Sequence, residues 1–490
     1  MNVLLVSPET PDTFWSFAHA LPFVSKRATH PPLGLLTVAA MLPDEWELRL
    51  VDLDVEPLRD EHIDAADVVF LGGMIVHRES AHEIAHRCHE RGRTVIAGGP
   101  LFTTGHEGFP EIDHFCLGEA EDVIERLVAD LEAGTLQRFY EPDGFPCLDH
   151  TPVPRWDLLD LDRYATMSVQ FSRGCPHDCE FCDVVVMNGH VPRTKTPEHM
   201  IAELEALHRA GWRRDVFVVD DNFIGNRRKT RQFLRALIDW RERTGIRMDF
   251  LTEATVDLAQ STELLALMVR AGFKKVFLGI ETPDQDALRE CHKLQNVRTD
   301  LEESVRILQN AGLEVMGGFI VGFDHDQPDV FQRQFAFIQR TGVVTAMVGL
   351  LNALPRTKLY QRLKREGRLL SDSAGNNTDA FCNFVPKLDR DTLENGYRQL
   401  MKRLYEPQVF YERAKAFLRN YRPHGPRRGL RREDVAALFR SMWVLGLRDR
   451  GRRAYWGFLA YALVRHRRAF AVAVTLAIHG YHFRRVARGL

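Results

Sequence analysis

Several features are scarce or missing in this chain of 490 residues. It contains only eight cysteines, no long low-complexity tract, and no uninterrupted apolar run of the ~20 residues that a membrane-spanning helix needs. Its N-terminus, MNVLLVSPE, has the pattern of a strand and no basic region, so we expect no signal peptide. A disulfide framework is therefore not expected, and the few cysteines favour a reducing cytoplasm.

Lysine is absent from the C-terminal region, where acidic residues are also few. Residues 421–490 contain 16 arginines and three acidic residues, a net charge of +13 in a chain whose total is −2. A strongly basic end indicates an anionic partner. Interspersed aromatic and aliphatic residues predict either peripheral contact with anionic lipid, at the inner face of a membrane, or an ordinary core beneath a solvated basic face. No known nucleic-acid-binding module is visible, so nucleic acid is not expected.

Two series of alternating strand and helix patterns follow one another along the chain. Residues 1–140 predict an open parallel α/β sheet, and residues 167–365 predict a partial (β/α)6 barrel. Between them, residues 141–166 contain four prolines and no clear period, which indicates a linker. Residues 366–490 predict a helical, basic extension. The candidate strands are 2–8, 47–54, 67–73, 94–100, 114–119, 167–172, 215–220, 247–252, 275–281, 314–321 and 344–351.

Three of the eight cysteines lie in the stretch SRGCPHDCEFCD, directly after the first strand of the second series. Cys175, Cys179 and Cys182 have the spacing C-x-x-x-C-x-x-C. Three thiolates are one ligand short of a structural zinc site, although His177 could be a fourth. On a cubane iron–sulfur cluster, three thiolates leave one iron open to an outside ligand. The spacing alone favours the open cluster and leaves zinc and structural thiols as alternatives.

The motif and its place after a first barrel strand resemble those of radical S-adenosylmethionine (SAM) enzymes. The aromatic Phe181, just before the last cysteine, also fits that family. The resemblance covers residues 167–365 and implies a [4Fe–4S] cluster whose free iron is chelated by the amino and carboxylate groups of SAM. It further implies that an external one-electron reductant triggers cleavage of SAM to a 5′-deoxyadenosyl radical.

Further barrel motifs come in the order that this family has. VVDDNF (218–223) closes the second strand, where the family binds the SAM ammonium, although its polar residues can also cap a turn. Carboxylates follow the third and fourth strands, where they can instead cap helices. GGFIVGFD (317–324) resembles the glycine motif that backs the adenine. The SAM-binding residues expected from the resemblance are Phe181, Asp220, Asp221, Asn222, Glu253, Glu281, Gly317 and Gly318.

The N-terminal series resembles the cobalamin-binding domain that precedes the barrel in one class of these enzymes. Glycines at its strand ends would let the backbone approach a corrin. The Asp-x-His-x-x-Gly motif, whose histidine ligates cobalt in many cobalamin proteins, is absent, because the region after the first strand reads SPETPDTFWSFAHALP. The resemblance then implies cobalamin bound without a protein ligand, or a domain that has kept only the fold. The expected cobalamin contacts are Gly72, Gly73, Gly98, Gly99, Gly118 and Glu119.

Over nearly its whole length, the chain resembles the cobalamin-domain radical SAM subfamily with a helical C-terminal extension, which includes the hopanoid C-2 methylase. Residues 31–54, 291–296 and 478–486 carry this match. It implies cobalamin-dependent methylation of an unactivated carbon in a small, hydrophobic, lipid-like substrate. The alternatives are radical C–C bond formation, cyclisation or rearrangement without cobalamin, and a non-enzymatic iron–sulfur or zinc protein. Cys291 could act as a radical-quenching thiol or a substrate contact, but a lone cysteine is more often a small buried hydrophobic residue, and that is what we expect here.

Overall fold

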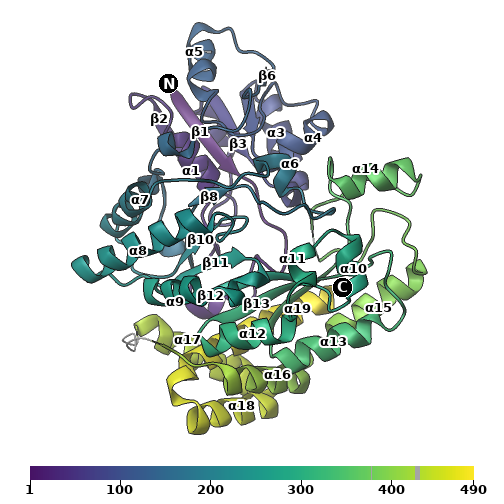
Figure 1. Cartoon of the computed structure of the whole chain (residues 1–490). Helices are drawn as coiled ribbons and strands as arrows, with labels where there is room; N and C mark the ends of the chain where they lie inside the picture. Colours follow the sequence, from purple (N-terminus) through teal and green to yellow (C-terminus); the bar gives the residue numbers. More distant parts are fainter. Residues whose placement is uncertain (377, 425–430) are drawn as a thin grey trace.

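The computed structural model describes residues 1–376, 378–424 and 431–490. Figure 1 shows a parallel sheet at the top, a second sheet with its helices in the middle, and a group of helices at the bottom. The predicted fold class is confirmed, because both sheets are parallel throughout and the C-terminal region is helical.

The N-terminal sheet has the strand order β2-β1-β3-β4-β5-β6. Its strands are β1 (Asn2–Ser7), β2 (Glu47–Asp52), β3 (Val68–Gly72), β4 (Thr94–Gly98), β5 (His114–Cys116) and β6 (Phe139–Tyr140). The connecting helices are α1 (Leu33–Ala39), α2 (Asp60–Asp64), α3 (Arg78–Glu90), α4 (Pro100–Gly105) and α5 (Ile124–Ala133). Apolar side chains on both faces of β1 are buried, as expected where helices cover both sides of a sheet. Sheets of this kind bind ligands beyond the carboxyl ends of their strands.

The second sheet has six parallel strands in the order β14-β13-β12-β11-β10-β7. Its strands are β7 (Met167–Val169), β10 (Val216–Val218), β11 (Phe250–Ala254), β12 (Phe273–Glu281), β13 (Glu314–Val321) and β14 (Thr345–Leu350). The helices between them include α7 (Pro197–Arg209), α8 (Arg227–Thr244), α9 (Thr262–Ala271), α12 (Leu301–Asn310) and α13 (Val330–Thr341). Because β7 and β14 do not pair with each other, the barrel is partial.

Residues 8–32, between β1 and α1, leave the first sheet and run beside the barrel. Ala28 forms a parallel bridge with Tyr164, which immediately precedes the β7 region. Farther along, the carbonyl oxygen of Phe23 accepts a hydrogen bond from Arg440 at 2.8 Å, and that of Thr13 lies 3.0 Å from Nε2 of His482. This crossing segment therefore links all three parts of the molecule. The sequence pattern predicts no structure for it.

Most of the C-terminal helices lie in the lower part of Figure 1, whereas α14 (Lys358–Arg365) lies apart from them at the upper right. The others are α15 (Arg390–Leu404), α16 (Pro407–Asn420), α17 (Arg432–Trp443), α18 (Arg452–Arg465) and α19 (Phe470–Gly489), with a π-helical turn at Val444–Arg448. α19 contacts α15, α16, α17 and α18, so it is the centre of this lower group. In the described part of the chain, no helix combines the length and the apolar character needed to cross a membrane.

Candidate active site

The cysteine loop lies between two short antiparallel strands, β8 (Ser172–Arg173) and β9 (Arg193–Thr194). Gly174, just before the first cysteine, has a φ of 97°. A Cβ atom there would lie 2.8 Å from the carbonyl oxygen of Asn188 and 2.9 Å from that of Gly189. The loop conformation therefore requires glycine at this position. Sequence reasoning did not predict this hairpin, because two-residue strands have no detectable period.

Two of the predicted SAM-binding residues, Asp220 and Asp221, hold this loop in place. Asp220 is buried and accepts hydrogen bonds from the backbone N–H of Phe171 (2.8 Å) and the hydroxyl of Ser172 (2.6 Å). Asp221 accepts from the N–H of Gly174 (3.0 Å) and the side-chain amide of Asn188 (2.9 Å). Burial raises the pKa of Asp220 to about 7. Both carboxylates thus have protein partners and brace the loop from the end of β10.

The three thiols are free of disulfides, and polar groups surround them. Cys179 is buried, whereas Cys175 and Cys182 are partly exposed. The side-chain amide of Gln295 lies 3.7 Å from Sγ of Cys179, and that of Asn222 lies 3.9 Å from Sγ of Cys175. Such N–H donors favour thiolates that are held on an iron–sulfur cluster. Among the residues that the structure describes, no three His, Cys, Asp or Glu side chains converge on a single metal ion.

Phe181 and Glu281 both lie close to a lysine that was not predicted from the sequence to belong to the site. The ammonium of Lys293, just before α11 (Leu294–Val297), lies 2.6 Å from Oε1 of Glu281 and 5.7 Å from the ring centroid of Phe181. Glu281 ends β12 with a φ of 63°. Because Glu281 already pairs with a cation, its carboxylate is less available to a ligand than a free one. A buried ammonium beside three thiols also favours a negatively charged group at this place.

Of the polar residues predicted to bind SAM, Asn222 and Glu253 have hydrogen-bond acceptors that no protein group uses. The amide oxygen of Asn222 is buried and has no hydrogen-bond partner. The Glu253 carboxylate, near the end of β11, has no hydrogen-bond donor among the described residues. Burial and the neighbouring Asp221 raise the pKa of Glu253 to about 8. Unsatisfied acceptors at the carboxyl ends of barrel strands are suited to a ligand with N–H or O–H donors.

The two predicted strand glycines face opposite sides of β13. A Cβ on Gly318 would lie 2.9 Å from the ring of Phe277, whereas one on Gly317 would meet the ring of Phe319 and Val343. Neighbouring residues in a strand alternate between the two faces, so only one of the pair faces the interior of the barrel. Since Phe277 contacts Trp15 there, Gly318 is the interior glycine.

The crossing segment 8–32 supplies an aromatic floor inside the barrel. Trp15 lies nearly parallel to Phe217 with a centroid distance of 6.1 Å, and its ring is 5.0 Å from Phe277. His30 packs on Phe217 at 5.4 Å, and both of its ring nitrogens are buried without a partner. Burial lowers the pKa of His30 to about 4, so the ring is neutral. No pattern in the sequence places these residues inside the barrel.

The predicted cobalamin glycines line the carboxyl edge of the N-terminal sheet. Gly99 has a φ of 96°, and a Cβ there would lie 3.0 Å from the carbonyl oxygen of Gly73. At Gly72, Gly98 and Gly118, an added Cβ would meet Leu35 (2.8 Å), the Cys116 carbonyl oxygen (3.2 Å) and Pro142 (3.4 Å). Neighbouring protein atoms therefore pack closely on these glycines and leave little room for side chains along this edge.

A polar group at the same edge was not predicted from the sequence. The Thr10 hydroxyl donates to Asp54 at 2.7 Å and lies 3.3 Å from Nε2 of His77. Burial lowers the pKa of His77. These residues follow β1, β2 and β3, so their convergence depends on the parallel pairing of the three strands.

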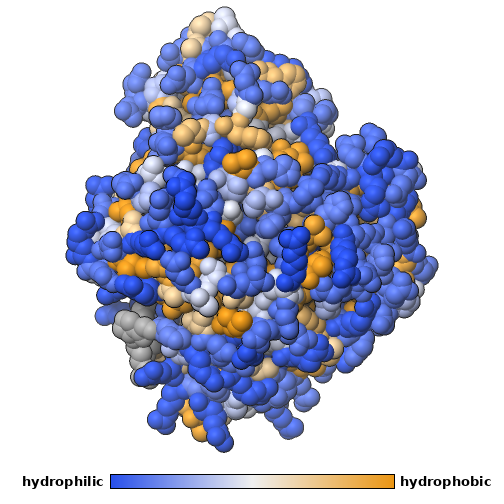
Figure 2. Space-filling view, in the orientation of Figure 1, coloured by the Kyte–Doolittle hydropathy of each residue, from blue (hydrophilic) through white to orange (hydrophobic). Residues whose placement is uncertain are grey.

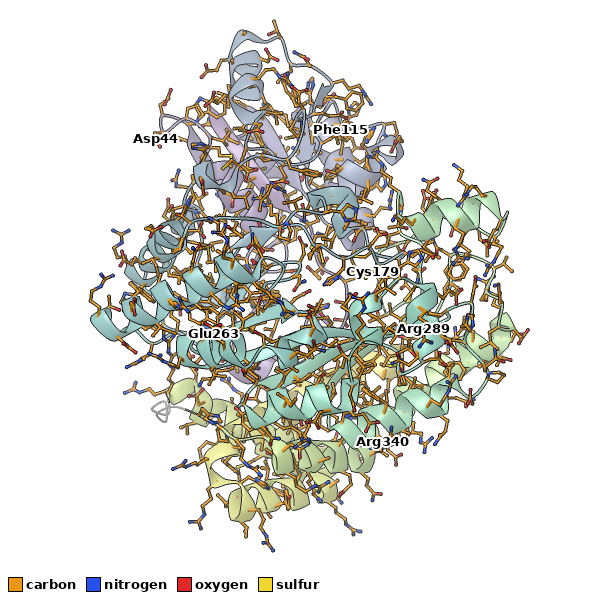
Figure 3. All side chains as sticks on the ribbon, in the orientation of Figure 1. Asp44, Phe115, Cys179, Glu263, Arg289 and Arg340 are labelled. Atoms are coloured by element: carbon orange, nitrogen blue, oxygen red, sulfur yellow. The ribbon has the colours of Figure 1, made fainter. Side chains whose placement is uncertain are left out.

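Glu119 joins this edge to the cysteine loop. Its carboxylate forms ion pairs with Arg173 (2.5 Å) and Arg193, and Glu121 also contacts Arg173 at 2.8 Å. Arg173 directly precedes Gly174, so the end of β5 is tied to the start of the loop. In Figure 3, Cys179 lies on the side of the barrel toward the N-terminal sheet, and Figure 2 shows hydrophobic residues at that junction.

Removing this junction carboxylate should destabilise the protein. Glu119→Ala leaves the largely buried Arg193 without an acidic partner and Arg173 with Glu121 alone, which costs about 3 kcal/mol. We expect a clear fall in the thermal unfolding midpoint by calorimetry. The matched control, Asp157→Ala, removes an exposed ion pair with Arg155 and should change the midpoint little. Equal midpoints for the two variants would contradict the junction role.

Three family models cover most of the chain. The B12 binding domain matches residues 23–128, the Radical SAM superfamily matches residues 169–337, and a domain of unknown function (DUF4070) matches residues 357–490. An uncharacterized methyltransferase of Synechocystis sp. is 41% identical over 99% of this chain and 91% of its own length. The hopanoid C-2 methylase of Rhodopseudomonas palustris is 34% identical over 95% of this chain and 90% of its own length. The chain belongs to the cobalamin-binding radical SAM family.

A solved structure supports the same fold. The cobalamin-dependent SAM radical enzyme OxsB, with aqua-cobalamin and SAM bound, aligns with a TM-score of 0.63 at 14% identity and covers 100% of this chain and 80% of its own. The chain is therefore a radical SAM enzyme whose cofactors are a [4Fe–4S] cluster, SAM and cobalamin. The cysteines with their N–H donors fit the cluster, and the unused acceptors of Asn222 and Glu253 fit SAM. The glycines and the polar group of Thr10, Asp54 and His77 at the carboxyl edge of the N-terminal sheet fit cobalamin.

Proposed function

We propose that this radical SAM enzyme methylates an unactivated carbon of a hydrophobic, lipid-like small molecule. The observation that carries the proposal is the Glu119–Arg173 ion pair, which brings the carboxyl edge of the N-terminal sheet to the cysteine loop. A methyl group and a carbon radical must be generated close together for the transfer to occur. The names of the Synechocystis and Rhodopseudomonas relatives, a methyltransferase and a hopanoid C-2 methylase, support this chemistry.

We assign the cluster to Cys175, Cys179 and Cys182. When bound, the cluster with SAM supplies a 5′-deoxyadenosyl radical, and cobalamin supplies the methyl group. Asn222 and Glu253 would accept hydrogen bonds from SAM, with Gly318 against its adenine. Asp220 and Asp221 would position the cysteine loop, Glu281 would hold Lys293, and Gly317 would pack on the outer face of the barrel. The proposed cobalamin contacts are Gly72, Gly73, Gly98, Gly99 and Gly118, with Glu119 holding the junction.

The lining of the barrel supports a hydrophobic substrate. Trp15, Phe217 and Phe277 present aromatic surface inside the barrel, and His30 is neutral there. Apolar walls exclude water from a radical, which would otherwise meet competing reactions. We further propose an external one-electron reductant, a cytoplasmic location and peripheral membrane contact through residues 421–490. The basic charge of that region supports the last of these.

The consumption of SAM tests methyl transfer against radical chemistry without it. One methylation uses one SAM to form 5′-deoxyadenosine and methionine, and a second SAM to restore the methyl group, which releases S-adenosylhomocysteine. With reconstituted protein, cobalamin, a reductant and a bacterial lipid extract under anaerobic conditions, we expect both nucleoside products in a ratio near one, by liquid chromatography. 5′-Deoxyadenosine that forms with lipid turnover but without S-adenosylhomocysteine would favour cyclisation or rearrangement instead.

A further inference from the structure

An exposed apolar stripe runs along α17 and the π-helical turn that follows it. Val435, Phe439, Trp443 and Leu447 are 40%, 64%, 53% and 56% exposed. Their spacing of four residues places them on one face of the helix. The opposite face contains Ala437, Ser441 and Leu445, which are buried against the rest of the molecule. The stripe therefore points away from the protein, although large apolar residues normally face a core.

A second exposed stripe on α18 joins the first. Trp456, Leu463 and Val464 are 40%, 52% and 71% exposed, whereas Tyr455, Phe458 and Leu459 on the other side are buried. The indole N–H of Trp456 donates to the carbonyl oxygen of Gly446 at 3.0 Å, and its ring lies over that glycine. Gly446 belongs to the π-helical turn, so the two stripes meet there. Contiguous apolar surface of this kind marks an interaction site.

Arginines without acidic partners border both stripes. The three acidic residues of this region are already engaged, because Glu433 pairs with Arg214, Asp449 pairs with Arg484, and Asp434 caps α17 through the N–H of Arg431. Arg448 lies over the ring of Trp443 at 4.9 Å. The exposed arginines of α17, the π-helical turn, α18 and the turn after it for which the described structure records no acidic partner are Arg432, Arg440, Arg448, Arg450, Arg452, Arg453, Arg465, Arg467 and Arg468.

We propose that the face formed by α17, the π-helical turn and α18 docks on a bilayer that contains anionic phospholipid. Aromatic side chains would enter the interface while the arginines contact the lipid phosphates. Charge complementarity favours an anionic bilayer at this face, because the face has unneutralised cations and no free carboxylate. The inference rests on the proposed function in one respect, since docking explains how the enzyme reaches a lipid-like substrate.

The docking face lies next to the segment that carries the barrel floor. In Figure 1, α18 lies at the bottom of the molecule and α17 at its lower left, both on the side away from the N-terminal sheet. α17 packs on the 3-10 turn Leu21–Val24, and Arg440 donates to the carbonyl oxygen of Phe23. That turn belongs to residues 8–32, the segment that places Trp15 inside the barrel. Docking would thus bring the membrane close to this segment.

Vesicle flotation of the full, cluster-loaded chain tests the proposal. The protein should float with vesicles of phosphatidylglycerol and phosphatidylcholine, bind phosphatidylcholine alone at least tenfold more weakly, and lose affinity with rising salt. Brominated phosphatidylglycerol should quench tryptophan emission, because Trp443 and Trp456 are the exposed tryptophans whereas Trp46, Trp156, Trp212 and Trp240 are buried. Loss of this quenching in the double variant Trp443→Phe/Trp456→Phe would locate the contact.

Two matched pairs of variants separate the apolar and charged contributions. Phe439→Ser/Trp443→Ser should weaken binding more than tenfold, whereas Leu370→Ser/Val385→Ser, at exposed apolar sites elsewhere, should not. Replacing Arg450, Arg452 and Arg453 with Gln should weaken binding by a similar factor, unlike the same change at the exposed barrel residues Arg209, Arg228 and Arg243.

Each outcome has a defined meaning. Failure of the unmodified protein to float, equal binding to both vesicle types, or equal losses in the test and control variants would overturn the proposal. A stripe that instead mediates self-association, seen as a dimer that the Phe439→Ser/Trp443→Ser variant dissolves, would also overturn it. SAM cleavage by the same samples in vesicle-free buffer reports separately on the proposed function, because these residues lie outside the active site.

Discussion

Cys175→Ser, Cys179→Ser and Cys182→Ser are each expected to abolish 5′-deoxyadenosine formation. All three thiols lie in one loop that is braced by Asp220 and Asp221, and each is assigned one ligand position of the cluster, so each substitution removes a ligand. Anaerobically reconstituted variants should lose most of the iron, the sulfide and the visible absorption of a [4Fe–4S] cluster. Iron analysis and anaerobic absorption spectra check the loading, and chromatography of the nucleoside products checks the reaction.

Cys291 provides the matched control for these variants. It is a buried cysteine close to the loop, and its carbonyl oxygen accepts from the N–H of Glu180 at 3.0 Å. Cys291→Ala keeps that backbone contact and should retain the cluster and the SAM cleavage. If a cysteine-loop variant loads iron and cleaves SAM to the same extent as Cys291→Ala does, the assigned ligand set is wrong.

Glu253→Gln should raise the dissociation constant of SAM by about 10- to 100-fold, the effect of losing a hydrogen bond to a charged acceptor. Its carboxylate is an unused acceptor in the barrel, and its pKa of about 8 in the free enzyme means that it is largely protonated at pH 7. A ligand that donates hydrogen bonds favours the ionised form, so SAM should bind more tightly as the pH rises from 6 to 9. Calorimetric titration in buffers of different ionisation enthalpy should also detect proton release on binding.

The pH dependence distinguishes a direct role of Glu253 from a merely structural one. The Glu253→Gln variant should lose the rise in SAM affinity with pH as well as the affinity itself. Glu263→Gln, an exposed change on α9 in the same barrel (Figure 3), should keep both. An unchanged pH profile in Glu253→Gln would assign the titration, and the proposed contact, to another group.

The sequence predicts those features that depend on local pattern. The eleven candidate strands all appear in the two sheets, and the expected strand at 314–321 has the same bounds as β13. Buried parallel strands are continuous apolar runs, and their order along the chain makes the carboxyl edge predictable. The cysteine spacing and its place after the first barrel strand likewise led to the family that the comparisons establish.

Features that depend on long-range contacts could not be predicted from the sequence. VVDDNF predicts acceptors for SAM, but the pairing of Asp220 with Ser172 is visible only once β10 lies beside β7. Trp15 and His30 come from a segment that lacks the cobalt-ligating motif, and their place inside the barrel follows from its crossing between domains. The Glu281–Lys293 pair joins a strand end to a later loop with no sequence signal of its own.

The central claim is that a carbon radical formed with SAM ends in methyl transfer. The most direct test is the mass of the lipid product when SAM carries a trideuterated methyl group, with reconstituted enzyme, cobalamin and a reductant. The account predicts a product in which one trideuteromethyl group replaces one hydrogen of the substrate. The Cys179→Ser variant should form no such product. A product that forms with turnover of SAM but carries no label would contradict it.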